Sequence, residues 1–344
     1  KDIRPREVQG EAKVCRGGLW FMRVLMVGRK PSIALDELRK YWGTVEVATG
    51  FFTPRLTRYD LVIAQEPTVK IGLPALLQAK LSNALLVTEV HGDYLRGNFL
   101  PWKDRLFAWF ALKSSDFVRA VNNGIASFLK SRGLSNVHVI PAVYIRLDIF
   151  KPLKNPDERG HVVVTAARLV PEKGLDLLLK SVPLLLRDFR DLEVRILGDG
   201  PMRETLQRLA RELGVEEVVK FLGWVSLEEL VKHYNEAAVF VCTSIYEGGP
   251  RTVFEAAACL TPSVSTPVGI VPEVLKEEES VLLVERRDPV LLAKKIALLL
   301  HDRDKRRRLA EKAREIVLRE FEWPKSVERY ARFYINLAER RLLK

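Results

Sequence analysis

Cysteine is scarce in this chain of 344 residues, which contains three. Cys15, Cys242 and Cys259 are too few and too far apart for a disulfide framework or a structural zinc site, which favours a reducing compartment. Long apolar runs are also missing. None reaches the ~18 residues of a membrane-spanning helix, and the opening 19 residues lack the apolar centre of a signal peptide. We therefore expect a cytoplasmic protein.

Glycine and proline are not abundant either, with 20 and 18 residues, whereas 47% of the chain is hydrophobic. This composition excludes a disordered or fibrous protein, and the length suffices for two domains with sizeable cores. The first methionine, Met22, stands directly before a strand-like run. We expect residues 1–21 to be an N-terminal extension outside the fold.

Negative charge is under-represented in the first half of the chain. Residues 1–150 hold 22 lysines and arginines against 13 aspartates and glutamates, and the remainder holds 34 against 31, within a net charge of +12. The basic half is expected to meet an anionic ligand or surface. Lipid headgroups and a phosphorylated carrier are favoured over nucleic acid, because the sequence has no zinc-finger spacing or RNP-like run.

Short apolar runs alternate with helical patterns along the chain, which is typical of βαβ units on parallel sheets. The runs cover residues 24–27, 45–48, 61–64, 84–88, 117–121 and 137–140, and then 161–166, 192–197, 218–222, 238–242, 263–265 and 281–284. We predict an α/β fold with two doubly wound domains. Their expected bounds are 22–148 and 161–322, with a Pro- and Asp-rich linker at 149–160 and an amphipathic helix at 323–344.

Two carboxylates, Glu247 and Glu255, stand eight residues apart around Gly248, Gly249 and Pro250. An apolar run ends just before them, so the segment is predicted to form a strand, a glycine turn and a helix with Pro250 at its first position. The free amides at such a helix N-terminus bind phosphate, and the carboxylates can accept hydroxyl protons from a polyol. A nucleotide-sugar combines both groups.

The charge of a leaving diphosphate has to be neutralised. The Asp302-Arg303-Asp304 triplet lies in a charge-dense helical pattern, so we expect a solvated surface there rather than a metal site. Arg168 and Lys173, which are spaced around a Pro-containing loop after a strand, are the alternative, together with helix-terminal amides. We predict that neither a metal nor another cofactor is required.

Residues 247–255 resemble the Glu-x7-Glu signature of retaining glycosyltransferases of family 4. Residues 167–174, 197–201 and 259–273 resemble three further motifs of that family. The resemblance implies a GT-B fold, in which two Rossmann-like domains face each other across a cleft and a C-terminal helix crosses back to the first domain. It also implies metal-independent hexosyl transfer, with retention, from a UDP-, GDP- or ADP-sugar to a glycan or lipid-linked acceptor.

The resemblance also assigns roles to single residues. Glu247, Arg168 and Lys173 would be catalytic, together with His91, which follows the run 84–88 in a His-Gly-Asp loop. The donor-binding residues would be Gly248, Gly249, Thr252, Val253, Glu255 and Val225, with phosphate bound by the amides of Thr252 and Val253. The remaining histidines have no such context and are predicted to be structural: His138, His161, His233 and His301.

The chain departs from the family pattern at two places. Where the family has a glycine pair after its first strand, residues 28–32 include Arg29 and Lys30, which we place on the acceptor side, gripping an anionic group. Where the family has an Asn-Gly turn at its hinge, residues 144–147 stand instead.

Residues 99–113 interleave aromatic and basic side chains. They fit either a core helix or an interfacial helix that contacts anionic lipid at the inner face of the membrane. Two other functions share the scaffold: a nucleotide-sugar epimerase, which converts its donor without an acceptor, and a non-catalytic nucleotide-sugar-binding protein. The second is disfavoured because Glu247 and His91 are both present.

Overall fold

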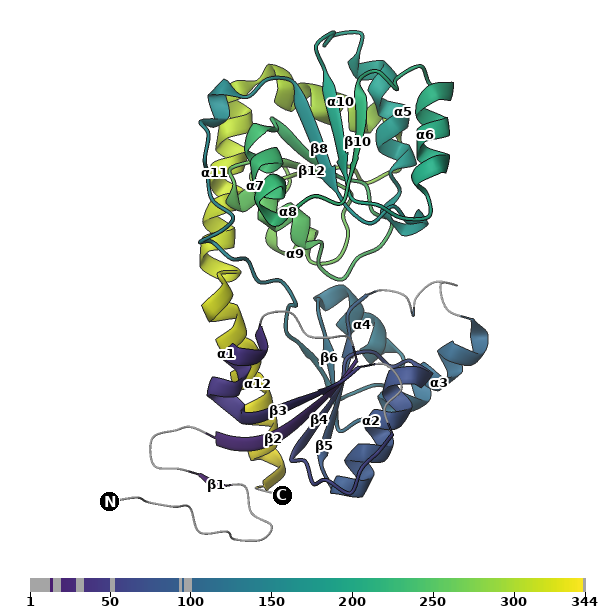
Figure 1. Cartoon of the computed structure of the whole chain (residues 1–344), viewed down its shortest axis with the longest axis vertical. Coiled ribbons are helices and arrows are strands. Elements are labelled where there is room, and N and C mark those ends of the chain that lie inside the picture. Colours follow the sequence, from purple (N-terminus) through teal and green to yellow (C-terminus); the bar gives the residue numbers. More distant parts are fainter. Residues whose placement is uncertain are drawn as a thin grey trace, which may run out of the picture.

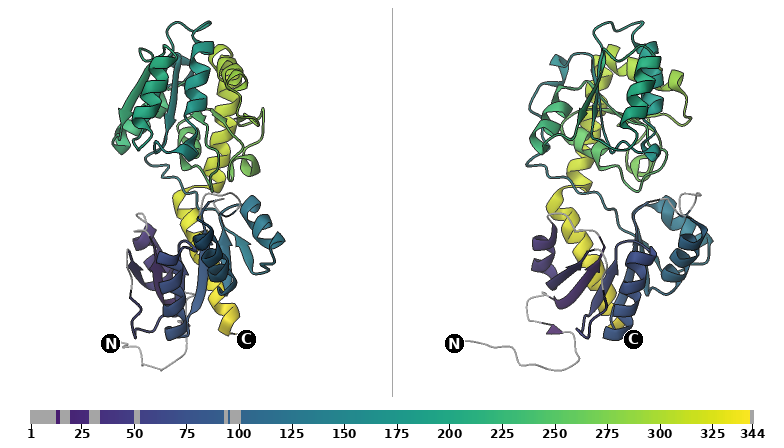
Figure 2. Two further views of the ribbon diagram at one scale, coloured as in Figure 1. Left: turned by 90° about the vertical axis from the view of Figure 1, so that its right-hand side faces the viewer. Right: turned by 45° about the vertical axis from the view of Figure 1, so that its right-hand side comes forward.

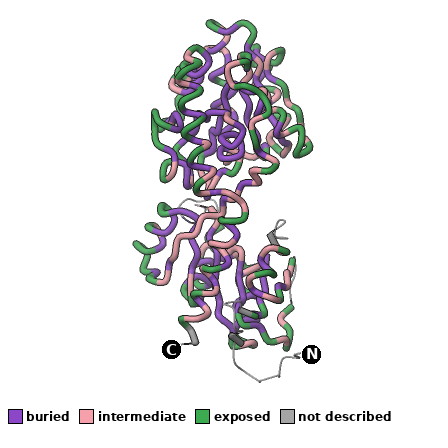
Figure 3. The backbone as a smooth tube through the Cα atoms, turned by 90° about the vertical axis from the view of Figure 1, so that its left-hand side faces the viewer, coloured by how far each residue is buried: buried purple, intermediate pink, exposed green. Residues whose placement is uncertain are grey.

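The computed structural model describes residues 13–14, 20–28, 34–49, 53–92, 95 and 101–342. They form two α/β domains, one above the other in Figure 1, and each domain is built on one sheet. Buried positions gather inside each domain, with exposed positions around them (Figure 3). The predicted fold class, α/β with two doubly wound domains, is confirmed.

The first sheet has the strand order β3-β2-β4-β5-β6-β7, all parallel, and the short β1 pairs antiparallel with β2. β4 (Leu61–Ala64) and β5 (Leu85–Val90) are buried at every position, as expected for strands covered on both faces. The other elements of this domain are β1 (Lys13–Val14), β2 (Trp20–Val27), α1 (Ala34–Trp42), β3 (Gly43–Ala48), α2 (Val69–Ser82), α3 (Trp102–Lys113), β6 (Phe117–Ala120), α4 (Asn123–Ser131) and β7 (Val137–Val139).

The second sheet has the order β10-β9-β8-β11-β12-β13, all parallel. Its order reverses between β8 (Val162–Ala166) and β11 (Val239–Cys242), and such a reversal opens a crevice at the carboxyl ends of the two strands. The other elements are η1 (Pro156–Glu158), η2 (Pro171–Lys173), α5 (Asp176–Leu185), β9 (Glu193–Leu197), α6 (Arg203–Glu212), β10 (Val219–Gly223), α7 (Leu227–Glu236), α8 (Arg251–Ala258), β12 (Ser263–Ser265), α9 (Val271–Val274), β13 (Leu282–Leu283), α10 (Pro289–His301) and α11 (Arg303–Glu320).

The chain ends in α12 (Trp323–Leu342), the yellow helix that runs from the second domain along the first in Figures 1 and 2. Val327, Ala331 and Tyr334 of this helix are part of the core of the first domain. The indole of Trp42 donates a hydrogen bond of 3.1 Å to the carbonyl oxygen of Ala331. The expected crossing helix is therefore present, and it completes the first domain.

The two segments that join the domains lie side by side. Ile145 donates through its amide to the carbonyl oxygen of Phe321 at 2.7 Å and accepts from the amide of Trp323 at 2.9 Å. The linker expected at residues 149–160 instead packs on the second domain, because the side chain of Phe150 is buried in that core. The crossing is thus made by the chain around Ile145 and by residues 321–323.

One further expectation needs correction. The segment 1–21 is not wholly outside the fold, because β1 pairs with the start of β2, where Lys13 lies opposite Phe21. At the Asp302-Arg303-Asp304 triplet, Arg303 and Asp304 are exposed as expected, and Asp302 is the N-cap of α11 and accepts the amide of Lys305 at 2.8 Å.

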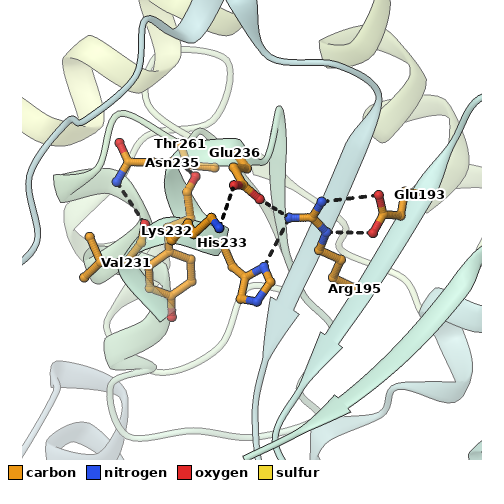
Figure 4. A network of polar contacts seen from close by, with 9 residues as sticks. Glu193, Arg195, Val231, Lys232, His233, Asn235, Glu236 and Thr261 are labelled. Carbon is orange, nitrogen blue, oxygen red and sulfur yellow. Dashed lines mark hydrogen bonds and ion pairs between the residues drawn. The ribbon is translucent and has the colours of Figure 1, made fainter. Parts of the chain in front are cut away.

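The four histidines predicted to be structural all pack against neighbouring side chains. In Figure 4, His233 of α7 meets Arg195 of β9, which also binds Glu193 and Glu236. Burial, followed by the nearby Arg195, lowers the pKa of His233. The other three histidines pack against phenylalanine rings. Phe117 and Phe333 contact His138, and Phe189 contacts both His161 and His301.

In the part of the chain that the structure describes, every helix is too short or too polar to cross a lipid bilayer.

Candidate functional site

Lys173 and Glu247 meet at the point where the second sheet reverses. Lys173 ends η2, which follows β8, and Glu247 stands in the loop after β11, 74 residues further along. The Lys173 ammonium forms an ion pair with Oε1 of Glu247, and the Ser244 hydroxyl donates to the same oxygen at 2.9 Å. Each side chain of the pair is 17% exposed. A positive and a negative group are therefore held ready at the crevice.

The backbone holds this pair in place. Gly174 follows η2 as its C-cap with φ +56°, and a side chain there would lie 2.6 Å from the carbonyl oxygen of Thr243. The Thr243 hydroxyl donates to the carbonyl oxygen of Lys173 at 3.0 Å. The Arg287 guanidinium donates to the carbonyl oxygen of Thr243 at 2.9 Å. The two loops are thus joined at the base of the Lys173–Glu247 pair.

Arg168 lies on the same loop as Lys173 but outside the ion pair. Its side chain is 59% exposed, and its guanidinium lies 3.8 Å from a carboxylate oxygen of Glu172. Such an exposed and long contact holds a side chain weakly. Arg168 can therefore turn towards an anionic ligand at little cost.

Helix α8 points its N-terminus at the site, with one difference from the prediction. Pro250 is the N-cap residue, and the helix begins at Arg251, so Pro250 is not the first helical residue. The amide of Val253 donates to the carbonyl oxygen of Pro250 at 3.1 Å. Thr252, which lines a small cavity with Lys173 and Glu247, is therefore a better amide donor to phosphate than Val253.

Glu255 is enclosed rather than open to the crevice. Its side chain is 4% exposed. Its Oε1 accepts from Nε and Nη2 of Arg251 at 3.1 and 2.9 Å, and its Oε2 accepts from the Tyr234 hydroxyl at 3.3 Å. Sequence reasoning placed this carboxylate on the ribose and missed Arg251, which lies one helical turn earlier. A ribose contact would require Arg251 to move.

Gly248 brings the second domain against the first, and Gly249 packs closely within the second-domain core. A side chain at Gly248 would overlap the carbonyl oxygen of His91, and one at Gly249 would lie 2.8 Å from Cγ2 of Val143. The carbonyl oxygen of Gly248 accepts from Nδ2 of Asn122 at 2.8 Å. Gly248 therefore permits a close approach to the first domain, and Gly249 permits close packing against Val143.

A second contact between the domains was not foreseen. The carboxylate of Glu273, at α9, accepts from the amides of Asn123 and Gly124 at 3.1 and 3.0 Å, at the N-terminus of α4. Asn122 is the N-cap of α4, and its Oδ1 accepts the amide of Ile125 at 2.8 Å. The contacts of Asn122 and Glu273 across the domains carry no signal in the sequence, because they depend on how the domains meet.

His91 follows β5 in the first domain and lines a cavity of about 360 Å³. The cavity is also lined by Gln65, Glu66 and Tyr144. Nε2 of His91 lies 2.8 Å from Oε2 of Glu89, a buried carboxylate that sequence reasoning missed. His91 thus lies beside Gly248, at the place where the two domains meet.

Three predicted positions lie apart from this cluster or outside the described chain. Val225 directly precedes the N-cap Ser226 of α7 and packs against the second-domain core. A base contact through its backbone stays a prediction. Arg29 and Lys30 are outside the described residues.

Comparisons with known proteins show what this chain is similar to. The family model described as Glycosyl transferases group 1 matches residues 148–316. The chain is 33% identical over 263 residues to the GDP-mannose-dependent alpha-(1-6)-phosphatidylinositol monomannoside mannosyltransferase of Mycolicibacterium smegmatis, covering 69% of this chain and 66% of that enzyme. It is 38% identical over 179 residues to the D-inositol 3-phosphate glycosyltransferase of Corynebacterium efficiens, covering 50% and 42%. The matches therefore span less than two thirds of the length of these relatives.

Among solved structures, Anabaena Alr3699/HepE in complex with UDP-glucose has a TM-score of 0.76 at 19% identity, covering 92% of this chain and 99% of that one. Sucrose-phosphate synthase from Thermosynechococcus elongatus has a TM-score of 0.72 at 22% identity, covering 81% and 74%. These likenesses concern the fold. Residues 148–316 therefore form a glycosyl transferases group 1 domain, and the fold of the chain is GT-B.

Proposed function

We propose that this chain is a retaining, metal-independent glycosyltransferase that moves a hexosyl group from a nucleotide-sugar to a hydroxyl acceptor. The observation that carries the proposal is the Lys173–Glu247 pair at the reversal of the second sheet, beside the N-terminus of α8. A cation and free amides suit a diphosphate, and a carboxylate suits sugar hydroxyls.

The chemistry follows from charge. When the bond between sugar and diphosphate breaks, the anomeric carbon becomes positive and the diphosphate negative. Lys173, Arg168 and the first amides of α8 would neutralise the anion without a metal or other cofactor. Glu247 would hold sugar hydroxyls and offset the positive carbon, and His91 would contact the sugar from the first domain. The leaving phosphate can take the acceptor proton on the same face, which gives retention without a side-chain base.

The donor is a UDP-, GDP- or ADP-sugar, and binding to the folded protein should raise its melting temperature. At a free ligand concentration 100 times Kd, one-site binding stabilises the folded state by about 2.7 kcal/mol. We expect one nucleotide series to raise Tm measured by differential scanning fluorimetry, and Lys173→Ala to abolish the rise. If every series leaves the wild-type Tm unchanged at millimolar concentration, the proposal is wrong.

With the donor identified, NMR of the product tests the reaction. We expect the anomeric proton coupling of the new glycoside to match that of the donor. Inversion of the coupling would contradict retention, and conversion of the donor without an acceptor would indicate an epimerase. Product formation in the presence of a chelator would support transfer without a metal.

The acceptor proposal rests on a surface formed by α2 and α3, which we call the α2–α3 face. Each helix exposes apolar side chains four residues apart and lysines on the same side: Val69, Leu73, Leu77 and Leu81 with Lys70 and Lys80 on α2, and Trp102, Leu106 and Phe110 with Lys103 and Lys113 on α3. The inner side of α3 is buried through Ala108, Ala111 and Leu112. In the part of 99–113 that the structure describes, the helix therefore buries one side in the domain and exposes the other, so it is not a pure core helix.

We propose that the α2–α3 face lies on an anionic bilayer at the cytoplasmic side and that the acceptor is lipid-linked, with a free glycan as the alternative. Apolar side chains would enter the headgroup region while the lysines pair with phosphate. The mannosyltransferase relative carries a phosphatidylinositol monomannoside in its name, which supports a lipid-linked acceptor.

If the α2–α3 face contacts a bilayer, the protein should bind anionic vesicles, and salt should weaken the binding because it screens the lysines from lipid phosphate. In co-sedimentation with phosphatidylglycerol vesicles at low salt, the double variant Leu77→Glu/Phe110→Glu should bind at least ~10-fold less than wild type, because it puts charge on the apolar strip. Leu227→Glu, at an exposed position of the second domain, is the matched control and should bind like wild type. Absence of wild-type binding, or equal loss in the control, would contradict membrane contact.

A further inference from the structure

Glu89 of β5 lies at the centre of a buried polar cluster. Its side chain is 2% exposed. Its Oε1 accepts from Nη1 of Arg119 at 2.6 Å, from the Tyr330 hydroxyl at 2.9 Å and from the Tyr334 hydroxyl at 2.5 Å. Its Oε2 bonds with Nε2 of His91. Both carboxylate oxygens are thus engaged, and one of them holds His91.

Arg119 is held from a second side. Its Nε donates to the carbonyl oxygen of Ile140 and its Nη2 to that of Pro141, both at 3.0 Å. The ring of Tyr330 lies 4.6 Å from the guanidinium carbon. The guanidinium is therefore fixed in place, and it fixes Oε1 of Glu89 in turn.

The charge state of Glu89 and the tyrosines determines which groups donate and which accept the hydrogen bonds of the cluster. Burial alone would raise the pKa of Glu89, but Arg119, His91 and Tyr334 outweigh it and hold the pKa below its usual range. Burial, reinforced by Glu89, raises the pKa of both tyrosines well above its usual value. Glu89 is thus an ionised carboxylate that accepts at both oxygens, and the tyrosines donate.

The hydrogen on His91 follows from this. Because Glu89 can only accept, Nε2 of His91 has to carry the proton that joins them. The neutral ring then has its lone pair on Nδ1, across the ring from Glu89. We infer that Glu89 is a positioning residue, which fixes the Nε2–H tautomer of His91 and turns Nδ1 towards the ligand. This inference rests on the proposed function for the role of His91 in transfer.

The cluster also includes the crossing helix. Tyr330 and Tyr334 belong to α12, which begins directly after the second crossing between the domains. Two of the three donors that hold Oε1 of Glu89 therefore come from the end of the chain, 241 and 245 residues away. The orientation of His91 thus depends on the docking of α12.

The test replaces the carboxylate by an amide. In Glu89→Gln the Arg119 and tyrosine donors still require an oxygen, so the NH₂ group is left facing His91. His91 can accept a hydrogen bond from this NH₂ group only if Nε2 is unprotonated, so the ring proton should move to Nδ1. We expect the tautomer to invert, which is read from the nitrogen shifts of His91 in the full chain labelled with ¹⁵N-histidine. The His91 signals are assigned by their loss in His91→Gln, in a mildly alkaline buffer.

Two further variants keep the test decisive. Glu89→Asp keeps the charge beside Arg119 but shortens the side chain, so the bond to His91 should be lost and the tautomers should mix; it replaces Glu89→Gln if that variant does not fold. Tyr59→Phe removes a 2.7 Å bond to Glu46 in the same domain and should leave the His91 signals unchanged. An Nδ1–H tautomer in wild type, or a pattern unaltered by both Glu89 variants, overturns the inference.

Activity separates this inference from the proposed function. In Glu89→Gln we expect kcat for sugar transfer to fall at least ~10-fold with the donor KM nearly unchanged. The reason is that a misoriented His91 disturbs the geometry of the reacting groups more than it weakens donor binding. Tautomer inversion with wild-type kcat would overturn the positioning role. If Glu89→Gln inverts the tautomer but the wild-type protein transfers no sugar, the assignment of the proton stands and the proposed function is rejected.

Discussion

Lys173→Ala is expected to lower kcat/KM for sugar transfer at least ~10²-fold, the usual effect of removing one group that stabilises developing charge. The ammonium is the cation that the structure places against Glu247, at the reversal of the sheet. Glu247→Ala should cost a similar factor. Turnover is measured with the donor found by melting experiments, and folding is checked by circular dichroism.

Lys180→Ala is the control for this pair. Lys180 also pairs with a carboxylate, Asp176 at 3.1 Å, but on the surface of α5. It should leave kcat/KM unchanged. The double variant Lys173→Ala/Glu247→Ala should be far less damaging than the product of the two single effects, because residues that act as a unit are not additive. Near-normal turnover in Lys173→Ala would remove the central element of the mechanism.

Gly248→Ala should abolish the approach of the two domains. A methyl group there overlaps the carbonyl oxygen of His91, which is backbone and cannot turn aside. We expect turnover to fall on the order of 10²-fold, as for a misplacement of about 1 Å at the reacting centre. The donor-induced rise in Tm should persist, because the donor contacts proposed for the second domain remain.

Gly160→Ala provides the matched control for Gly248→Ala. Gly160 is exposed, and a methyl group there meets no atom within 4 Å. It should leave both turnover and donor binding unchanged. If Gly248→Ala keeps wild-type turnover, the contact between Gly248 and His91 is not part of the working state.

Sequence patterns predicted the parallel strands but not β1, because buried parallel strands require continuous apolar runs. β4 and β11, for example, have the bounds expected within one residue, and both are buried throughout. The proximity of Lys173 and Glu247 could also be predicted, because both residues follow adjacent parallel strands whose carboxyl ends meet at one edge of the sheet. Pro250 was misplaced by one position because cap geometry depends on backbone angles that the residue type alone does not fix.

What the sequence could not supply are contacts between segments that meet only after folding. Glu273 reaches the amides of α4 across the two domains, and Glu89 receives hydroxyls from α12. No local pattern distinguishes such carboxylates from the many surface glutamates of the chain. The burial of Glu255 under Arg251 is a related case, because the spacing allowed the pair but did not require it.

The paired crossing at Ile145 and Phe321–Trp323 has a mechanical consequence. Two neighbouring chain segments that are hydrogen-bonded to each other bend together more easily than they twist or slide past each other. Separation of the domains would then be a swing about this short ribbon, with α12 carried along by the first domain. Such a swing would release the bond between Asn122 and Gly248 together with the bonds between Glu273 and the amides of α4, so these contacts would open and close as one unit when the domains part and meet.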